Sequence, residues 1–265
     1  MNPKVSVITI TYNAERFLKN TIESVVNQTN NDFEYLIVDG SSSDGTTAII
    51  EQYDNYGYES YEAALNRGEE SLGKIIWISE PDKGLYDAMN KGLRLAKGDF
   101  VWFINAGDKI YDQNTMQTVV ETIVGHPDCD VVYGQSIIID EEDKLFGERH
   151  KIAPRNLTRR SLLDGLVVCH QSILVRKTIA PEYDLQYRLA ADYDWVCKVV
   201  SVSRHNCYID DYISRFMVAG ISSQQYKKSW QERFFIMKKH FGLLPTLWAH
   251  LKIAIKYPFS SIQRS

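Results

Sequence analysis

Long apolar runs are missing from this sequence of 265 residues. No stretch of about 18 uncharged apolar residues occurs, so we expect no membrane-spanning helix. The short apolar run near the start leads into a strand and a turn, which is unlike a secretory signal peptide. A long basic run is also missing and the formal net charge is −4, which argues against nucleic acid as the main partner.

Cysteine is scarce, and no two cysteines have CxxC spacing. The four are Cys129, Cys169, Cys197 and Cys207. Because neither a metal-binding nor a disulfide framework is evident, we interpret them as buried, small apolar residues rather than as disulfides. Free thiols are typical of a reducing compartment, so the sequence favours a cytoplasmic protein.

Glycine-rich phosphate loops are missing too. The sequence has no GxGxxG, so it lacks the dinucleotide-binding fingerprint. It also has no GxxxxGK[ST], which argues against a P-loop that binds nucleotide phosphates. Apolar residues are plentiful: 44% of the chain is hydrophobic and 24% is charged. This composition supports the core of one large domain, or of one domain with an appendage.

Strand and helix patterns alternate through the first part of the chain. Branched and aromatic runs predict buried strands at residues 5–10, 35–38, 75–78 and 100–104. Helical spacing predicts helices that begin after Asn13, a candidate N-cap, and at residues 46–53 and 85–97. The alternation predicts an α/β fold with a mostly parallel central sheet flanked by helices.

Three of these strands end in polar residues. The first ends at Thr11-Tyr12-Asn13, the second at Asp39-Gly40-Ser41, and the fourth at Asn105-Ala106-Gly107-Asp108. Since the carboxyl ends of parallel strands share one edge of a sheet, these groups can converge on one ligand. The alternative is that they are ordinary polar turns.

The second half has a different organisation. Residues 130–148 predict a hairpin whose acidic tip, residues 140–143, we interpret as solvated rather than as a metal site. An apolar run leads to His170-Gln171, and a helix is predicted from residue 189 to about residue 200. Short strands are predicted around residues 208–209 and 214–218, then a flexible loop at residues 219–223 and a helical remainder.

Together, the three strand ends and the later Ala190-Ala191-Asp192-Tyr193-Asp194 resemble the inverting family 2 glycosyltransferases of GT-A fold, of the bacterial polysaccharide type. The resemblance implies a GT-A catalytic domain over residues 1–220, with a nucleotide-binding half to about residue 110, and a helical C-terminal tail over residues 221–265. It also implies a nucleotide-sugar donor, Mg²⁺ or Mn²⁺, and inverting transfer to a hydroxyl of a glycan or lipid-linked sugar in cell-surface polysaccharide synthesis.

The resemblance also implies roles for individual residues. The nucleotide-binding residues are Thr11, Tyr12, Asn13, Asp39, Gly40 and Asn105. The family usually carries Asp-x-Asp where this chain has Asn105 and Gly107, so Asp108 remains as the metal ligand. Lys83 and Arg176 are candidates to assist the diphosphate, although lone basic residues are more often solvated.

Asp192 corresponds best to the family's catalytic base, which takes the proton of the acceptor hydroxyl. The alternative is that Asp192 caps its helix, a task that Asp194 can also perform. His170, Gln171 and Asp194 are expected on the acceptor side, with a structural role for His170 equally favoured.

Two other functions stay open. The missing carboxylates are compatible with an inactive nucleotide-sugar-binding protein. A nucleotidyltransferase is less favoured, because the sequence lacks a glycine-rich basic loop after the first strand.

The C-terminal tail combines apolar residues at helical spacing with basic ones. The apolar residues are Leu243, Leu244, Leu247, Trp248, Leu251 and Ile255, and the basic ones are Lys252, Lys256 and Arg264. Such a helix can lie in a membrane interface. The alternative is packing on the catalytic domain or on a second subunit of a homo-oligomer.

Overall fold

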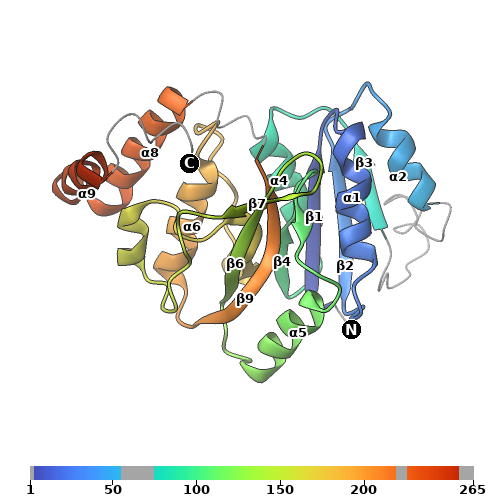
Figure 1. Ribbon diagram of the computed structural model, residues 1–265, viewed down its shortest axis with the longest axis horizontal. Helices are drawn as coiled ribbons and strands as arrows, with labels where there is room; N and C mark the ends of the chain where they lie inside the picture. The colour runs from blue at the N-terminus through green and yellow to red at the C-terminus, as the bar shows by residue number, and fades with distance from the viewer. Residues whose placement is uncertain (1–2, 55–74, 219–225, 257–265) are drawn as a thin grey trace.

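The computed structural model describes residues 3–54, 75–218 and 226–256 (Figure 1). In these ranges the strands form one sheet of nine, in the order β3-β2-β1-β4-β8-β6-β9-β5, with β7 beside β6. The strands are β1 (Val5–Thr11), β2 (Phe33–Asp39), β3 (Ile75–Ser79), β4 (Phe100–Phe103), β5 (Lys109–Ile110), β6 (Val131–Ile139), β7 (Leu145–Glu148), β8 (Ile173–Arg176) and β9 (Asn206–Met217).

The sheet changes character along its width. Strands β3, β2, β1 and β4 are parallel, as the sequence predicts. Beyond β4 the sheet is mixed, because β8 is antiparallel to both β4 and β6, whereas β9 is parallel to β6. The prediction of two short strands near residues 208 and 214 is wrong. Strand β9 is continuous because it pairs with β6 along its whole length, through register shifts near Tyr133 and Gln135.

Helices cover both faces of the sheet. On one face lie α1 (Glu15–Val26), α2 (Thr46–Asp54) and α5 (Thr115–Gly125); on the other lie α4 (Leu85–Leu95) and α6 (Ala191–Val202). The alternation of side chains along each strand explains the two layers. Trp102 of β4 packs in the first layer, and its neighbour Phe103 packs in the second.

Helix α1 begins without the N-cap that the sequence predicts. The N-cap residue is Ala14, whose side chain forms no capping hydrogen bond. The Asn13 prediction is wrong because a neighbouring loop binds the free amides instead. The amide of Ala14 donates to Oγ1 of Thr46 (2.8 Å), and that of Glu15 donates to Oδ2 of Asp44 (3.2 Å).

The chain ends in two helices, α8 (Tyr226–Phe241) and α9 (Leu243–Lys256), separated by Gly242 with a φ of 85°. A glycine accommodates this left-handed turn without strain. Among the described residues, no helix is long and apolar enough to cross a membrane. The four cysteines are buried and have free thiols, which confirms the predicted burial. The predicted flexible loop at residues 219–223 lies outside the described residues.

Candidate active site

The carboxyl ends of β1, β2 and β4 lie side by side at one edge of the sheet. Thr11 at the end of β1 pairs with Asp39 at the end of β2. Beyond β4, the amide of Ala106 donates to the carbonyl of Ile10 (3.1 Å). The predicted convergence of the three strand ends is therefore confirmed, and a single ligand can span them.

The loops that follow β1 and β2 are fastened to each other. Oδ1 of Asn13 accepts a hydrogen bond from the amide of Ser43 (2.8 Å), and the amide of Asn13 donates to Oγ of Ser42 (2.8 Å). A carboxylate oxygen of Glu15 accepts from the amide of Gly45 (2.9 Å). These bonds build a fixed wall at the strand ends without a glycine-rich phosphate loop.

An exposed aromatic ring and a carboxylate meet at Gly40. Tyr12 is 64% exposed, although its Cδ2 would lie only 3.3 Å from a Cβ on Gly40. That Cβ would also lie 2.5 Å from Oδ2 of Asp82, so glycine is required for these side chains to approach the backbone. Sequence reasoning missed Asp82, which lies in the loop after β3 and accepts from the amide of Gly84 (2.7 Å). The ring of Tyr12 can stack on a nucleobase, and the carboxylate of Asp82 can accept hydrogen bonds from ribose hydroxyls.

Asp39 is fully buried and strongly bonded within the protein. Its Oδ2 accepts from the amide of Ser42 (2.9 Å) and the hydroxyl of Ser79 (2.6 Å). Its Oδ1 accepts from the hydroxyl of Ser42 (2.5 Å). A carboxylate accepts about four hydrogen bonds, and three of these positions are filled within the protein. Asp39 therefore joins the ends of β2 and β3 whether or not a nucleotide is bound.

Two side-chain oxygens at this edge are buried with no partner among the described residues. They are Oγ1 of Thr11 and Oδ1 of Asn105. An unpaired buried acceptor costs about 1–3 kcal/mol, so such atoms usually find a partner in water or a ligand. Both residues belong to the predicted nucleotide-binding set.

Asp108 connects three segments of the chain. Its Oδ2 accepts from Nε2 of Gln171 (2.8 Å), and its Oδ1 accepts from the amide of Met217 (3.0 Å). Burial raises the pKa of Asp108 to about 7, against the smaller opposing effect of these two bonds. Each oxygen retains a second lone pair. Together with the unpaired oxygen of Asn105, these donors fit a hard cation such as Mg²⁺ or Mn²⁺.

Asp192 lies in the first turn of α6 and is partly exposed. Its Oδ1 accepts from the amide of Tyr193 (2.8 Å) and from the hydroxyl of Tyr86 (3.4 Å). The N-cap of α6 is Ala190, whose side chain forms no capping hydrogen bond, and Asp192 and Asp194 both lie inside the helix. The alternative that Asp192 or Asp194 serves as its cap is therefore wrong.

An aromatic cluster lies beside Asp192. Tyr86 of α4 stacks on Tyr183, with ring centroids 5.6 Å apart, and Tyr183 stacks on Trp195 of α6 at 5.2 Å. Nε2 of His170 lies 2.7 Å from the hydroxyl of Tyr183. Because burial lowers the pKa of His170, its ring is neutral at pH 7. His170 and Gln171, both predicted on the acceptor side, therefore contact different groups. His170 belongs to this aromatic cluster, whereas Gln171 donates to Asp108.

Helix α8 holds the segment that leads into α6. The carboxylate of Glu232 accepts from the amides of Arg188 (3.0 Å), Leu189 (2.8 Å) and Ala190 (3.0 Å). Three backbone donors are thereby satisfied immediately before Asp192. Sequence reasoning missed Glu232, because its partners are more than forty positions away in the chain.

Asp194 also binds α8. Its completely buried carboxylate lies 2.6 Å from Nζ of Lys198, 3.2 Å from Nζ of Lys239 and 2.8 Å from Nε2 of His240. Burial alone would raise its pKa. The bonds from His240 and Lys198 outweigh burial and hold the pKa of Asp194 well below its ordinary value. The carboxylate is therefore charged and joins α6 to α8.

The charges of two arginines act on a buried lysine in the second half of the chain. Burial, followed by the charges of Arg233 and Arg149, lowers the pKa of Lys151 to about 8, against the opposing charge of Asp164. Nε of Arg233 is buried without a hydrogen-bond partner among the described residues. Positive charge that Asp164 offsets only in part suits an anionic group.

The two candidate diphosphate cations lie in different places. Arg176 pairs with Phe100 at the beginning of β4 and donates to the carbonyls of Cys129 and Pro127. It lies at the end of β4 away from Asn105, so the prediction that it assists the diphosphate is wrong. Lys83 follows Asp82 in an exposed loop at the site's own edge of the sheet.

Comparison with known proteins identifies relatives. Residues 6–183 match the family model described as glycosyl transferase family 2. A PGL/p-HBAD biosynthesis glycosyltransferase of Mycobacterium bovis is 34% identical over 197 residues, which cover 73% of this chain and 68% of that protein. A putative teichuronic acid biosynthesis glycosyltransferase of Bacillus subtilis, TuaG, is 27% identical over 173 residues, covering 65% and 62% of the two chains.

Solved structures share the fold at low sequence identity. TarS of S. aureus, in complex with UDP, aligns over 97% of this chain and 73% of its own chain, with a TM-score of 0.68 and 18% identity. The mannosyltransferase PcManGT of Pyrobaculum calidifontis, in complex with GDP-Man and Mn²⁺, aligns over 99% and 78%, with a TM-score of 0.60 and 13% identity. The predicted GT-A type of α/β fold is therefore confirmed.

Proposed function

This chain belongs to glycosyltransferase family 2, and from that premise we propose that it transfers a sugar from a nucleotide-sugar donor to a hydroxyl group with inversion at the anomeric carbon. The observation that carries the proposal is the arrangement around Asp192. This partly exposed carboxylate opens α6 and is bonded to Tyr86, whose helix follows the loop that carries Asp82.

We assign donor binding to the half of the chain that ends near residue 110. Tyr12 offers a ring for the base, and Asp82 and the remaining acceptor position of Asp39 offer oxygens to ribose or base. The backbone at Gly40 and Asn13 and the unpaired oxygens of Thr11 and Asn105 complete this set. Complexes of TarS with UDP and with UDP-GlcNAc support a nucleotide sugar as the donor class.

We assign Asp108 to a divalent cation, with further ligands from the donor diphosphate. The oxygen donors present there fit Mg²⁺ or Mn²⁺, and the Mn²⁺ complex of PcManGT supports this assignment. A bound ion of this kind would neutralise charge on the departing diphosphate. Lys83, at the same edge of the sheet, would add positive charge.

Asp192 supplies the base for the transfer. As the acceptor oxygen bonds to the anomeric carbon, its proton passes to Asp192, and the bond from that carbon to the diphosphate oxygen breaks with its electron pair. The acceptor attacks from the face opposite the diphosphate, which accounts for inversion. Tyr86 and the amide of Tyr193 bond Oδ1, so Oδ2 is the oxygen available to the proton. His170 and Gln171 support this side through the aromatic cluster and Asp108.

We further propose that the acceptor is a lipid-linked sugar at the cytoplasmic face of a membrane. On α9 the exposed apolar side chains form one stripe: Leu243, Leu244, Leu247, Trp248 and Leu251. The opposite face of α9 is buried through Thr246 and Ala249, so the stripe does not pack on the catalytic domain. Lys252 lies over the Trp248 ring, which places a basic side chain beside the apolar stripe. The side chains of Ile255, Lys256 and Arg264 lie outside the described residues.

The basic group of Arg149, Lys151 and Arg233 agrees with such an acceptor, because a lipid-linked sugar carries phosphate. We expect Lys151→Met to raise the KM for a diphosphate-linked lipid acceptor and to leave the KM for the nucleotide sugar unchanged. Equal effects on both would remove the acceptor role from Lys151.

The proposed activity is tested with a panel of UDP, GDP and TDP sugars, with and without Mn²⁺. Thermal shift detects which donor stabilises the chain, and release of the nucleoside diphosphate detects turnover. We expect one donor class to do both. Stabilisation without any release, across a range of glycan and lipid-linked acceptors, would identify an inactive nucleotide-sugar-binding protein instead.

A further inference from the structure

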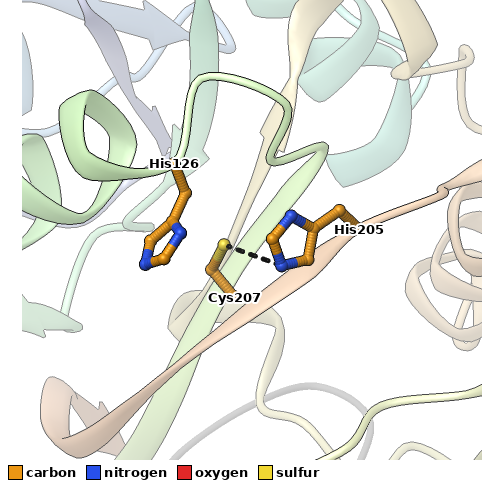
Figure 2. Close-up of side chains that lie close together, drawn as sticks. All are labelled: His126, His205 and Cys207. Atoms are coloured by element: carbon orange, nitrogen blue, oxygen red, sulfur yellow. Dashed lines mark hydrogen bonds between the residues drawn. The ribbon is translucent and has the colours of Figure 1, made fainter.

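A second group of chemically active side chains lies at the opposite edge of the sheet from Asp108. His126 follows α5, His205 precedes β9, and Cys207 is in β9. Their ligand atoms all lie within 4.8 Å of one another, and Figure 2 shows the three side chains converging. We call these residues the His–Cys cluster. It lies where β6 and β9 begin, close to Arg176, the last residue of β8, which pairs with the first residue of β4.

The ring of His205 is oriented for metal binding. Its Nδ1 lies 3.1 Å from Oδ2 of Asp128, and its Nε2 lies 3.9 Å from Sγ of Cys207. A carboxylate at Nδ1 favours the tautomer that carries its proton there, which leaves a lone pair on Nε2. Metal-binding histidines are usually supported by such a carboxylate.

A further sulfur lies next to the cluster. Cys129 is fully buried, and its Sγ donates to the carbonyl of Val131 (3.1 Å), outside the group whose ligand atoms all lie within 4.8 Å of one another. Two imidazoles and two thiols are the ligand set of structural zinc sites. In a tetrahedral zinc site with bonds of about 2.0–2.3 Å, neighbouring ligand atoms lie about 3.5 Å apart. The cluster needs only a small contraction to reach that spacing, and the exposed position of His126 leaves room for it.

We propose that His126, His205 and Cys207 bind one Zn²⁺ ion, and that Cys129 completes the coordination by giving up its bond to the carbonyl of Val131. The nitrogen and sulfur donors select a softer ion than the oxygen donors near Asp108, which suit Mg²⁺ or Mn²⁺. The ion would fasten the loop between α5 and β6 to the start of β9, and its role is structural. This proposal does not rest on the proposed transfer reaction.

The test uses the full chain, reduced and freed of metal with a chelator. Zn²⁺ should bind with one-to-one stoichiometry and raise the melting temperature, while Mn²⁺ at the same concentration should not displace it. Co²⁺ should give the absorption of a tetrahedral thiolate complex. His126→Gln and Cys207→Ser should each remove the stoichiometric binding, and His150→Gln and Cys197→Ser serve as matched controls.

Asp128→Asn gives a finer measurement, because it leaves all four ligands in place. We expect it to weaken Zn²⁺ binding about 10- to 100-fold, as loss of a carboxylate behind a metal-bound histidine does. Absence of stoichiometric Zn²⁺ binding by the wild-type chain would overturn the proposal. Retention of full affinity and of the Co²⁺ thiolate absorption in folded Cys207→Ser would overturn it as well.

Discussion

The hydroxyl of Tyr86 donates a hydrogen bond of 3.4 Å to Oδ1 of Asp192, and this bond joins the two halves of the chain. Tyr86 lies in the first turn of α4, directly after the loop that carries Asp82. Asp192 lies in the first turn of α6. The proposed base is therefore connected to the loop proposed to contact the nucleotide.

Asp39→Ala should weaken binding of the preferred nucleotide by about 1–3 kcal/mol, the range for a hydrogen bond with a charged partner. Calorimetry with UDP, GDP and TDP measures the change. Ser79→Ala is the matched control, because it removes one internal bond to Asp39 and keeps the carboxylate. If all three nucleotides bind the Asp39 variant as they bind wild type, Asp39 has only its structural role.

Asp108→Ala should abolish the enhancement of donor binding by Mn²⁺, since no other carboxylate lies in the segment from Asn105 to Asp108. Titration of the donor with and without Mn²⁺ measures this enhancement. The variant also loses the bonds to Gln171 and Met217, so the titration is done at a temperature where circular dichroism shows a folded chain. An unchanged Mn²⁺ dependence would exclude Asp108 as a ligand.

Local pattern was sufficient to predict the strands of the donor half and their polar ends. The β-branched run before Thr11 and the aromatic run before Asn105 each form a buried strand, and the parallel arrangement brings their ends together. The positions of the strand ends, and hence of most candidate site residues, followed from this arrangement alone.

Contacts between distant segments could not be predicted. Asn13 was a reasonable N-cap by residue type, yet Asp44 and Thr46 of the next loop bind the free amides. Glu232 supports the entry to α6 from a helix that follows much later in the chain. The four cysteines were interpreted as apolar residues. His126 and His205 lie next to Cys207 in space. The two histidines come from loops far apart in the sequence and do not have zinc-finger spacing.

Asp194→Asn should destabilise the fold at pH 7 by about 1.5–3 kcal/mol, the range for hydrogen bonds with charged partners, because Lys198 and Lys239 lose the charge of Asp194 but stay partly exposed to solvent. The folded-state pKa of Asp194 is lower than the unfolded value near 3.8, so this stabilisation is present above that pH. It is lost as the pH falls towards the folded-state pKa. Urea unfolding of both proteins from pH 7 to pH 3 should show the difference shrinking below about pH 4. A difference that persists unchanged in acid would exclude the ion pairs as its cause.

Flotation with vesicles containing anionic lipid tests the tail. The full-length chain should float with the vesicles, and a chain that ends at Gly242 should not. Leu244→Glu combined with Trp248→Glu should also prevent flotation without loss of fold, because these side chains are 78% and 60% exposed. Equal non-binding by the full-length and shortened chains would end the membrane proposal and leave a second subunit as the alternative partner for the apolar stripe.

The most direct test of the account compares Asp192→Asn with Asp194→Asn in transfer rate and in donor affinity. Asparagine keeps the shape of Asp192 but cannot take a proton at neutral pH. Asp192→Asn should therefore lose about 10²- to 10⁴-fold in turnover with unchanged donor affinity. Asp194→Asn, assayed where it is folded, should keep its turnover, because Asp194 binds Lys198, Lys239 and His240 rather than the acceptor. Loss of turnover in Asp194→Asn with retention in Asp192→Asn would assign the base to the other carboxylate, and retention in both would contradict the mechanism.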